Sequence, residues 1–239
     1  MVSVLIVSIK VFSFNKGGVF LGIQVTDLLD LNEFWFSKIF DDVQGPWEVL
    51  SRIKPWFREI AESLPDDYQQ IAENVWIGKG TTIEKTVTIK GPAIIGYNCE
   101  LRQSAFIREY VLIGNSAVIG NSTEIKNSII FNKAQIPHFN YVGDSVLGYG
   151  AHLGAGVVIS NLKSNKEQIK VKDGGAVIET GLRKFGAIVG DNAEVGCNTV
   201  LFPGTIIGRN SIVYPLTPVR GVVPENHILK NTGEIVPRR

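Results

Sequence analysis

Few residues of this chain could cross-link it or oxidise. Its 239 residues include two cysteines, one methionine and three histidines. Cys99 and Cys197 lie far apart in the sequence, so we predict free thiols in a reducing cytoplasm rather than a disulfide framework. An excess of one charge is also missing, because 24 basic and 23 acidic residues leave a formal net charge of +1. This balance gives no whole-chain reason to expect nucleic acid or an anionic membrane as the partner.

A hydrophobic run long enough to cross a bilayer is absent as well. The apolar start, MVSVLIVSI, is interrupted by Lys10, whereas a transmembrane helix needs about 20 apolar residues. It also lacks the basic start and the small-residue cleavage site of a secretory signal. We interpret residues 1–9 as a strand that packs on the domain or as an upstream-extended start, and we expect a cytoplasmic protein with no membrane partner.

What the sequence does contain is a large apolar residue at every sixth position. The first run extends from Ile77 to Phe131, shorter runs follow from Ile136 and Leu147, and a last run covers 189–219. A period of six matches neither a helix nor a simple strand alternation. It fits six-residue sides, each a short strand followed by a corner where glycine or asparagine accepts an unusual backbone. Three sides make one coil, so we predict an all-β parallel β-helix of about six coils stacked at strand spacing.

The parts of the sequence without the repeat indicate how the chain is organised into domains. We predict an N-terminal segment with a small, mostly helical cap over residues 1–70, and a β-helix domain over 71–239. Residues 45–64 have helical apolar spacing, which Pro55 should split into two short helices or kink. The cap is expected to cover an open end of the coils, although a separate lobe is the alternative. An inserted loop near 161–188 interrupts the repeat and is expected to leave the prism.

A more specific signal is the run PHFNYVGDSVLGYGAHLGAG, which begins at Pro137. It resembles the acetyltransferase domain of the bifunctional N-acetylglucosamine-1-phosphate uridylyltransferase/glucosamine-1-phosphate acetyltransferase, and that of related archaeal sugar-1-phosphate nucleotidylyltransferases. The resemblance covers about residues 75–230. It implies a left-handed β-helix of the hexapeptide-repeat acyltransferases, a homotrimer with sites between subunits, and acetyl-CoA as cosubstrate without a metal. The first 70 residues are too few for a nucleotidyltransferase domain, so we expect no uridylyl transfer.

The resemblance also implies roles for single residues. His138 matches the general base, and an imidazole with an ordinary pKa near 6.5 is available in its neutral form at pH 7. Arg108 and Lys126 match cations that hold the sugar phosphate. The repeat adds that both follow an inward residue and lie eighteen positions apart, so they should point outward from adjacent coils. The slip in the repeat near residue 135 is expected to displace His138 from their column to a corner, toward a neighbouring subunit.

Further positions match substrate or coenzyme contacts of that family. Tyr141, His152 and Lys184 fall at sugar-contacting positions, with Lys184 in the insert and His152 in place of an asparagine. Gly154, Ala155, Asn161 and Cys197 fall at acetyl-CoA-contacting positions. Without the resemblance, we would interpret each cation as a solvated surface residue and Gly154 as a residue needed for the packing of coils.

Three functions remain open at this point. The first is an acetyl-CoA-dependent acyltransferase acting on an amino-sugar phosphate or a nucleotide sugar. The second is a catalytically silent sugar-phosphate-binding or regulatory subunit that partners a nucleotidyltransferase. The third is a γ-class carbonic anhydrase, which needs two zinc histidines five apart. The histidines at 138, 152 and 227 do not have that spacing.

Overall fold

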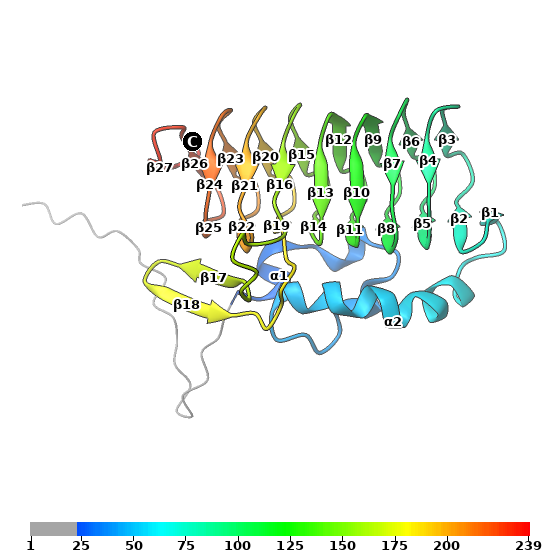
Figure 1. Ribbon diagram of the computed structural model, residues 1–239, viewed down its shortest axis with the longest axis horizontal. Helices are drawn as coiled ribbons and strands as arrows, with labels where there is room; N and C mark the ends of the chain where they lie inside the picture. The colour runs from blue at the N-terminus through cyan, green and yellow to red at the C-terminus, as the bar shows by residue number, and fades with distance from the viewer. Residues whose placement is uncertain (1–22) are drawn as a thin grey trace, which may run out of the picture.

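The computed structural model describes residues 23–239 and shows a three-sided prism of parallel sheets (Figure 1). Sheet A contains β1 (Gln69–Ala72), β2 (Val75–Ile77), β5 (Ala93–Ile95), β8 (Val111–Ile113), β11 (Ser128–Ile130), β14 (Val146–Leu147), β19 (Ala187–Val189), β22 (Thr205–Ile207) and β25 (Val222–Val223). Sheet B contains β3 (Thr82–Ile83), β6 (Glu100–Leu101), β9 (Val118–Asn121), β12 (Gln135–His138), β15 (His152–Leu153), β20 (Glu194–Val195), β23 (Ile212–Val213), β26 (His227–Leu229) and β27 (Ile235–Pro237). Sheet C contains β4 (Thr88–Ile89), β7 (Phe106–Ile107), β10 (Glu124–Lys126), β13 (Tyr141–Gly143), β16 (Val158–Ile159), β21 (Val200–Leu201) and β24 (Pro218–Val219).

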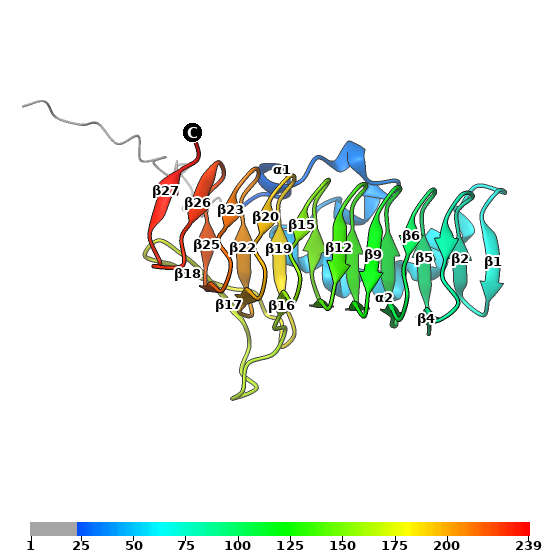
Figure 2. The same ribbon diagram turned by 90° about the horizontal axis from the view of Figure 1, so that it is seen from above.

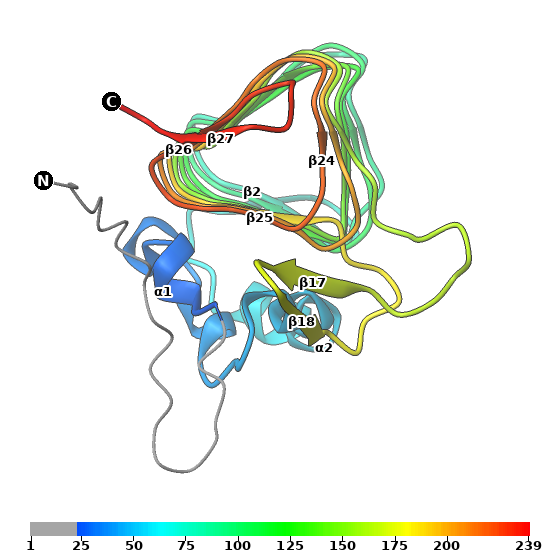
Figure 3. The ribbon, with the colours of Figure 1, turned by 90° about the vertical axis from the view of Figure 1, so that its left-hand side faces the viewer.

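The coils wind in the left-handed sense. Seen from the C-terminal end, the chain passes clockwise from β24 through β25 to β26 while successive coils advance toward the viewer (Figure 3). The left-handed β-helix is therefore confirmed. The prism is longer than the six coils expected, because sheet C has seven strands and sheets A and B have nine each. Two of those extra strands, β1 and β27, pair antiparallel with β2 and β26 at opposite ends of the prism (Figure 2).

The repeating apolar residues form the interior of the prism. Ile107, Ile125 and Val142 are in register in sheet C and are fully buried. Each coil stacks its inward side chains on those of the next, so one apolar column fills each sheet's inner face. Ile83 is 39% exposed because it belongs to the first coil, which has no preceding coil to cover it.

One residue of the repeat was assigned to the wrong face. Phe131 was expected to point inward, but Ile130 belongs to the interior cluster instead. The corner between β10 and β11 consists of Asn127 alone, so the inward position comes one residue earlier. Phe131 points away from the prism axis and stacks on Phe34, with ring centroids 4.9 Å apart. The six-residue count slips here, at the corner between sheets C and A.

Corners repeatedly use the left-handed backbone region. Asn98, Ser122, Phe139 and Asn198 have φ between +53° and +54°. Asparagine tolerates this region because its short polar side chain can bond locally. The Phe139 side chain cannot form such a local hydrogen bond, so its left-handed backbone is imposed by the corner that the chain makes there.

The N-terminal segment lies along the outer face of sheet A (Figures 1 and 3). It contains α1 (Val25–Leu28), η1 (Leu31–Glu33), η2 (Ser37–Phe40), η3 (Pro46–Glu48) and α2 (Val49–Glu62). The mostly helical character is as expected, but the segment covers a side of the prism and not an open end. The reason is that sheet A has apolar residues on its outer face too, and these are fully buried: Ile94, Leu112, Ile129, Val146, Ile188 and Ile206. The division at residue 70 stays a prediction, since the segment and sheet A share one core.

Pro55 does not divide α2 into two helices. The helix is continuous over its 14 residues, with Pro55 inside it. Pro55 is exposed, whereas Ile53, Phe57 and Ile60 are buried on the opposite face. The hydrogen bond lost at proline therefore lies on the solvent side, and packing against sheet A holds the helix together.

The insert leaves the prism after β16 and returns before β19, as expected. It forms an antiparallel hairpin of β17 (Lys170–Asp173) and β18 (Ala176–Glu179). Ile169, Val171 and Phe185 anchor it in the core shared by sheet A and the N-terminal segment. Within residues 23–239, no helix is long and apolar enough to cross a membrane.

Replacing Ile129 with alanine tests the packing of the N-terminal segment on sheet A. Ile129 is 0% exposed, so Ile129→Ala should lower the free energy of unfolding by about 2–5 kcal/mol, as in other cores. Denaturant unfolding followed by circular dichroism measures this. The control Ile71→Ala, at a side chain that is 46% exposed, should change stability by less than about 0.5 kcal/mol. Equal small effects would show that the segment does not pack there.

Candidate functional site

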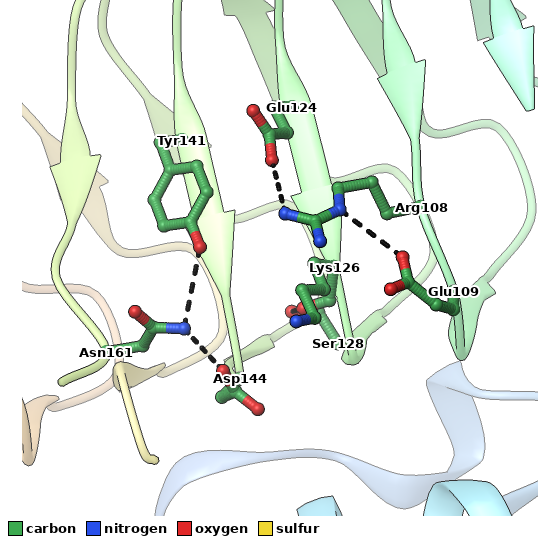
Figure 4. A network of polar contacts seen from close by, with 8 residues as sticks. All are labelled: Arg108, Glu109, Glu124, Lys126, Ser128, Tyr141, Asp144 and Asn161. Carbon is green, nitrogen blue, oxygen red and sulfur yellow. Dashed lines mark hydrogen bonds and ion pairs between the residues drawn. The ribbon is translucent and has the colours of Figure 1, made fainter. Parts of the chain in front are cut away.

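The outer face of sheet C carries a cluster of polar side chains (Figure 4). Strand alternation explains it, because Glu124 and Lys126 flank the inward Ile125 and so both point outward. We call this group the sheet C cluster: Arg108, Glu109, Glu124, Lys126, Tyr141, Asp144 and Asn161. Unlike sheet A, this face is not covered by the N-terminal segment.

Arg108 and Lys126 lie in adjacent coils on the same face, as their spacing indicated. Ile107 and Ile125 are in register, and the Arg108 backbone N–H donates to the Ile125 carbonyl at 2.8 Å. Arg108 is already paired with acids, its Nη1 lying 2.9 Å from Glu124 Oε1 and its Nε 3.3 Å from Glu109 Oε2. The Glu124 hydrogen bond raises the pKa of Arg108.

Sequence reasoning missed both acids of this ion-pair group. The signal for Glu124 was the same alternation that placed Lys126 outward. Glu109 precedes a turn, where its direction does not follow from any period. The pKa of Glu109 is lowered, first by a backbone hydrogen bond and also by the charge of Arg108.

Tyr141 extends the cluster toward the next coil. It is half-buried, and its hydroxyl oxygen accepts from Asn161 Nδ2 at 3.5 Å. Burial, followed by the nearby Glu124 and Asp144 charges, raises the pKa of Tyr141. The phenol therefore stays protonated at neutral pH and can donate a hydrogen bond to a ligand.

A ladder of side chains follows the corner between sheets C and A, which we call the C–A corner. Asn127 Nδ2 donates to Asp144 Oδ1 at 2.8 Å, and Asn161 Nδ2 donates to Asp144 Oδ2. Asp144 is only 5% exposed. This ladder places Asn161 beside Tyr141 in the sheet C cluster, away from the other residues expected to contact the coenzyme.

Three of the expected site residues stack along the corner between sheets B and C, which we call the B–C corner. The His138 carbonyl accepts from Gly156 N–H at 3.0 Å, and the Ala155 carbonyl accepts from Asn198 N–H at 2.8 Å. These ladder bonds place His138, Ala155 and Cys197 at equivalent positions of successive coils. Sequence reasoning named all three but did not predict that they would share a column.

His138 lies at a corner, as expected. It pairs in register with Asn121, which precedes it by 17 residues and not by the 18 that separate Ile107 from Ile125, so the slip shifts it by one position. The slip occurs at the C–A corner, whereas the side containing His138 keeps its regular length. His138 is exposed, and its ring has no hydrogen-bond partner among residues 23–239.

Close coil packing accounts for Gly154. A β-carbon at this position would lie 2.7 Å from the backbone nitrogen and 3.0 Å from Sγ of Cys197. The Gly154 carbonyl also accepts from the buried Asn140 Nδ2 at 2.7 Å. These contacts explain the glycine without a ligand.

The remaining two residues lie elsewhere. His152 is half-buried on the outer face of sheet B, in register with Gln135 and Glu194. Lys184 is exposed near the end of the insert and lines a cavity beside α2.

Within one chain the expected site is therefore spread over several places. His138 lies five residues before Gly143, which is in register with Lys126. Five residues of fully extended chain span at most roughly 16 Å, and the turn at Phe139 shortens that distance. Residues 23–239 contain no group of three or more histidine, cysteine or acidic side chains that could hold a metal ion.

Comparisons with known proteins show which proteins this chain is similar to. The family model described as the GMPPB C-terminal domain matches residues 89–184. The "Bifunctional protein GlmU" of Methanococcus vannielii is 32% identical over 215 residues, covering 88% of this chain and 50% of that protein. The "Bifunctional sugar-1-phosphate nucleotidylyltransferase/acetyltransferase" of Sulfurisphaera tokodaii is 32% identical over 212 residues, covering 81% and 51%. The chain thus spans about half the length of the curated relatives it matches.

A solved structure gives a weaker match. A mutant of AntD, an N-acyltransferase from Bacillus cereus, has a TM-score of 0.41 and 15% identity over 74% of this chain and 92% of that one. A match of this quality adds nothing to the sequence relationship.

Fold and sequence together define a left-handed β-helix protein with hexapeptide repeats. More particularly, this chain resembles the bifunctional GlmU and sugar-1-phosphate nucleotidylyltransferase/acetyltransferase proteins. The resemblance noted from the PHFNYVGD run is confirmed.

Substituting Gly154 separates coil packing from ligand contact at that position. Gly154→Ala should lower the free energy of unfolding by about 1–3 kcal/mol, because the added methyl group meets backbone that cannot move freely. Thermal or denaturant unfolding of the ligand-free protein measures this. Ala155→Ser, at the adjacent and partly exposed corner position, should change stability by less than about 0.5 kcal/mol. If Gly154→Ala is as stable as the parent, packing is not the reason for the glycine.

Proposed function

We propose that this chain is an acetyl-CoA-dependent acyltransferase whose acceptor is an amino-sugar phosphate or a nucleotide sugar. The observation that carries the proposal is the column of His138, Ala155 and Cys197 at the B–C corner. It puts a histidine next to the residues expected to contact acetyl-CoA, at one edge of the face that holds Arg108 and Lys126. Sequence similarity to proteins named as acetyltransferases supports the same activity.

In the proposed reaction His138 acts as the general base. Its neutral imidazole accepts a proton from the sugar amine as the nitrogen lone pair attacks the thioester carbonyl carbon. A C–N bond forms, the tetrahedral intermediate collapses, and the C–S bond breaks. The coenzyme A thiolate leaves and takes up a proton. Backbone N–H groups at the B–C corner are candidates to stabilise the oxyanion.

The acceptor phosphate is proposed to bind at the far edge of sheet C. Arg108 can present two donors to a phosphate, and Lys126 adds a second cation in the next coil. Binding requires Arg108 to share or exchange the Glu109 and Glu124 contacts seen without ligand. Tyr141, with a raised pKa, is the candidate donor to a sugar hydroxyl.

We further propose a homotrimer in which two chains complete each site. Phe139, next to His138, is 63% exposed, and Leu216, three coils further along the B–C corner, is 70% exposed. Burying these side chains against a second copy would remove apolar surface from water. It would also bring the His138 column of one chain to a face of its neighbour, which overcomes the separation between His138 and Lys126 within one chain.

A silent sugar-phosphate-binding or regulatory subunit is the second candidate. Two observations favour it: the His138 ring has no partner to orient it among the described residues, and Arg108 is already paired with two acids. Such a subunit would bind sugar phosphate without consuming acetyl-CoA. Thiol release from acetyl-CoA, measured with glucosamine 1-phosphate and with UDP-glucosamine as acceptors, separates the two functions.

His138→Ala tests the general-base role. The loss of a positioned base should reduce acetyl transfer by about 10²–10⁴-fold, while the thermal midpoint stays close to that of the parent because His138 is exposed. Thiol release gives the rate. The control is His227→Ala, a histidine near the C-terminus whose Nδ1 lies 2.7 Å from the Glu225 carbonyl. Full turnover by His138→Ala would eliminate this mechanism.

Arg108→Ala tests the phosphate site. It should weaken glucosamine 1-phosphate binding by about 1.5–3 kcal/mol, the range for a hydrogen bond to a charged group. Titration calorimetry measures the affinity. Arg102→Ala is the matched control, because Arg102 also pairs with a carboxylate, Glu100 at 2.7 Å, but lies outside the sheet C cluster. Unchanged affinity in the Arg108 variant would place the phosphate elsewhere.

A further inference from the structure

A cavity of about 480 Å³ lies beyond the sheet C cluster, where the insert, the first turn of α2 and the C–A corner meet. Figure 3 shows the insert leaving the prism at this corner and folding back beside α2. Three cations, Lys166, Arg183 and Lys184, line the cavity. Leu50 of α2 and Leu162 and Leu182 of the insert supply apolar walls.

The three cations have no ion-pair partner among the residues that the structure describes. No acidic residue lines the cavity, and within residues 23–239 the side chains of Lys166, Arg183 and Lys184 have no ion pair or hydrogen bond. Two other cations of the same insert have partners. Lys170 pairs with Glu179 at 2.7 Å, and Lys163 Nζ donates to the Gln168 carbonyl at 2.8 Å. Like charges around one cavity repel each other, so an anion placed among them would relieve that repulsion.

The cavity adjoins the proposed phosphate site. Asn127 lines it and is the residue directly after Lys126. The Asn127 side chain is fixed by its hydrogen bond to Asp144. A ligand that lies across sheet C with a phosphate at Lys126 could therefore extend past the C–A corner into the cavity.

We propose that the cavity binds the nucleoside and the inner phosphate of a nucleoside-diphosphate sugar whose outer phosphate lies at Arg108 and Lys126, so that the acceptor is a nucleotide sugar. This inference rests on the proposed acyl transfer. The three unpaired cations suit the charge of a phosphate group, and the leucines offer apolar contact to a ribose or base. The volume lies within the range of small-ligand sites, about 300–1,000 Å³.

Binding measured without acetyl-CoA tests the cavity. Titration calorimetry is run with UDP, GDP and ADP as probes, and with glucosamine 1-phosphate and inorganic phosphate for comparison. At least one nucleoside diphosphate should bind more tightly than inorganic phosphate. The double variant Lys166→Gln/Arg183→Gln should lose at least about 10-fold in affinity for that nucleotide, since two charge-assisted contacts are removed. Its affinity for glucosamine 1-phosphate should fall less.

Lys170→Gln is the matched control, because it removes one exposed lysine of the same insert outside the cavity. Its nucleotide affinity should stay within about twofold of the parent, as expected of a distant surface charge that salt screens. The inference is overturned if the double variant binds nucleotide as well as the parent. An equal loss in Lys170→Gln, or nucleotide binding no tighter than inorganic phosphate, would overturn it too.

The outcomes for the cavity and for the proposed acyl transfer are separable. Cation-dependent nucleotide binding without thiol release from acetyl-CoA, with either glucosamine 1-phosphate or UDP-glucosamine as acceptor, would refute the transferase and leave the cavity as a nucleotide site. Thiol release with either acceptor, combined with nucleotide binding that ignores Lys166 and Arg183, would refute the cavity alone.

Discussion

The structure depends on the in-register stacking of inward apolar side chains from coil to coil. Backbone ladders hold each strand against the next, as where Ile107, Ile125 and Val142 follow one another in sheet C. A coil cannot bury its own apolar residue alone, so the burial of each depends on its neighbours. This constraint fixes the spacing of the outer side chains as well. Arg108 and Lys126 are adjacent because the residues before them are stacked.

The outer faces of sheets A and C differ in whether other parts of the chain cover them. Sheet A is apolar on both sides, and Ile129 and Val146 bury their side chains beneath the N-terminal segment. That segment and the insert hairpin consequently lie along the sheet A side of the prism and leave the sheet C face open (Figures 1 and 3). The polar cluster could form only on a side that needs no apolar cover. The same segment contributes α2, whose first turn forms one wall of the cationic cavity.

Charge compensation differs between the two candidate anion sites. On sheet C, Arg108 lies between Glu109 and Glu124 and pairs with both. In the cavity, Lys166 and Arg183 have no ion pair within the part of the chain that the structure describes. An anion arriving at sheet C must compete with carboxylates, whereas one arriving in the cavity meets unpaired cations. A ligand bearing more than one phosphate could place one at the paired Arg108 and another among the unpaired cations of the cavity.

The sequence by itself determined the β-helix, its inward residues and the outward stacking of Arg108 on Lys126. All of these follow from a period of six that one buried face enforces. It also indicated the excursion of the insert, because the period stops there. The corner lengths were not encoded in that way, so Phe131 was assigned to the wrong face.

Only the tertiary structure decided where the non-repeating parts lie. The helical spacing of α2 showed an apolar stripe but not which surface would receive it, and Pro55 did not split a helix that sheet A supports. Nor could spacing reveal that Asn161 bonds to Asp144, or that Lys184 joins Lys166 across a cavity. Contacts between segments with no common period depend on how their surfaces fit together, and that fit exists only once the chain has folded.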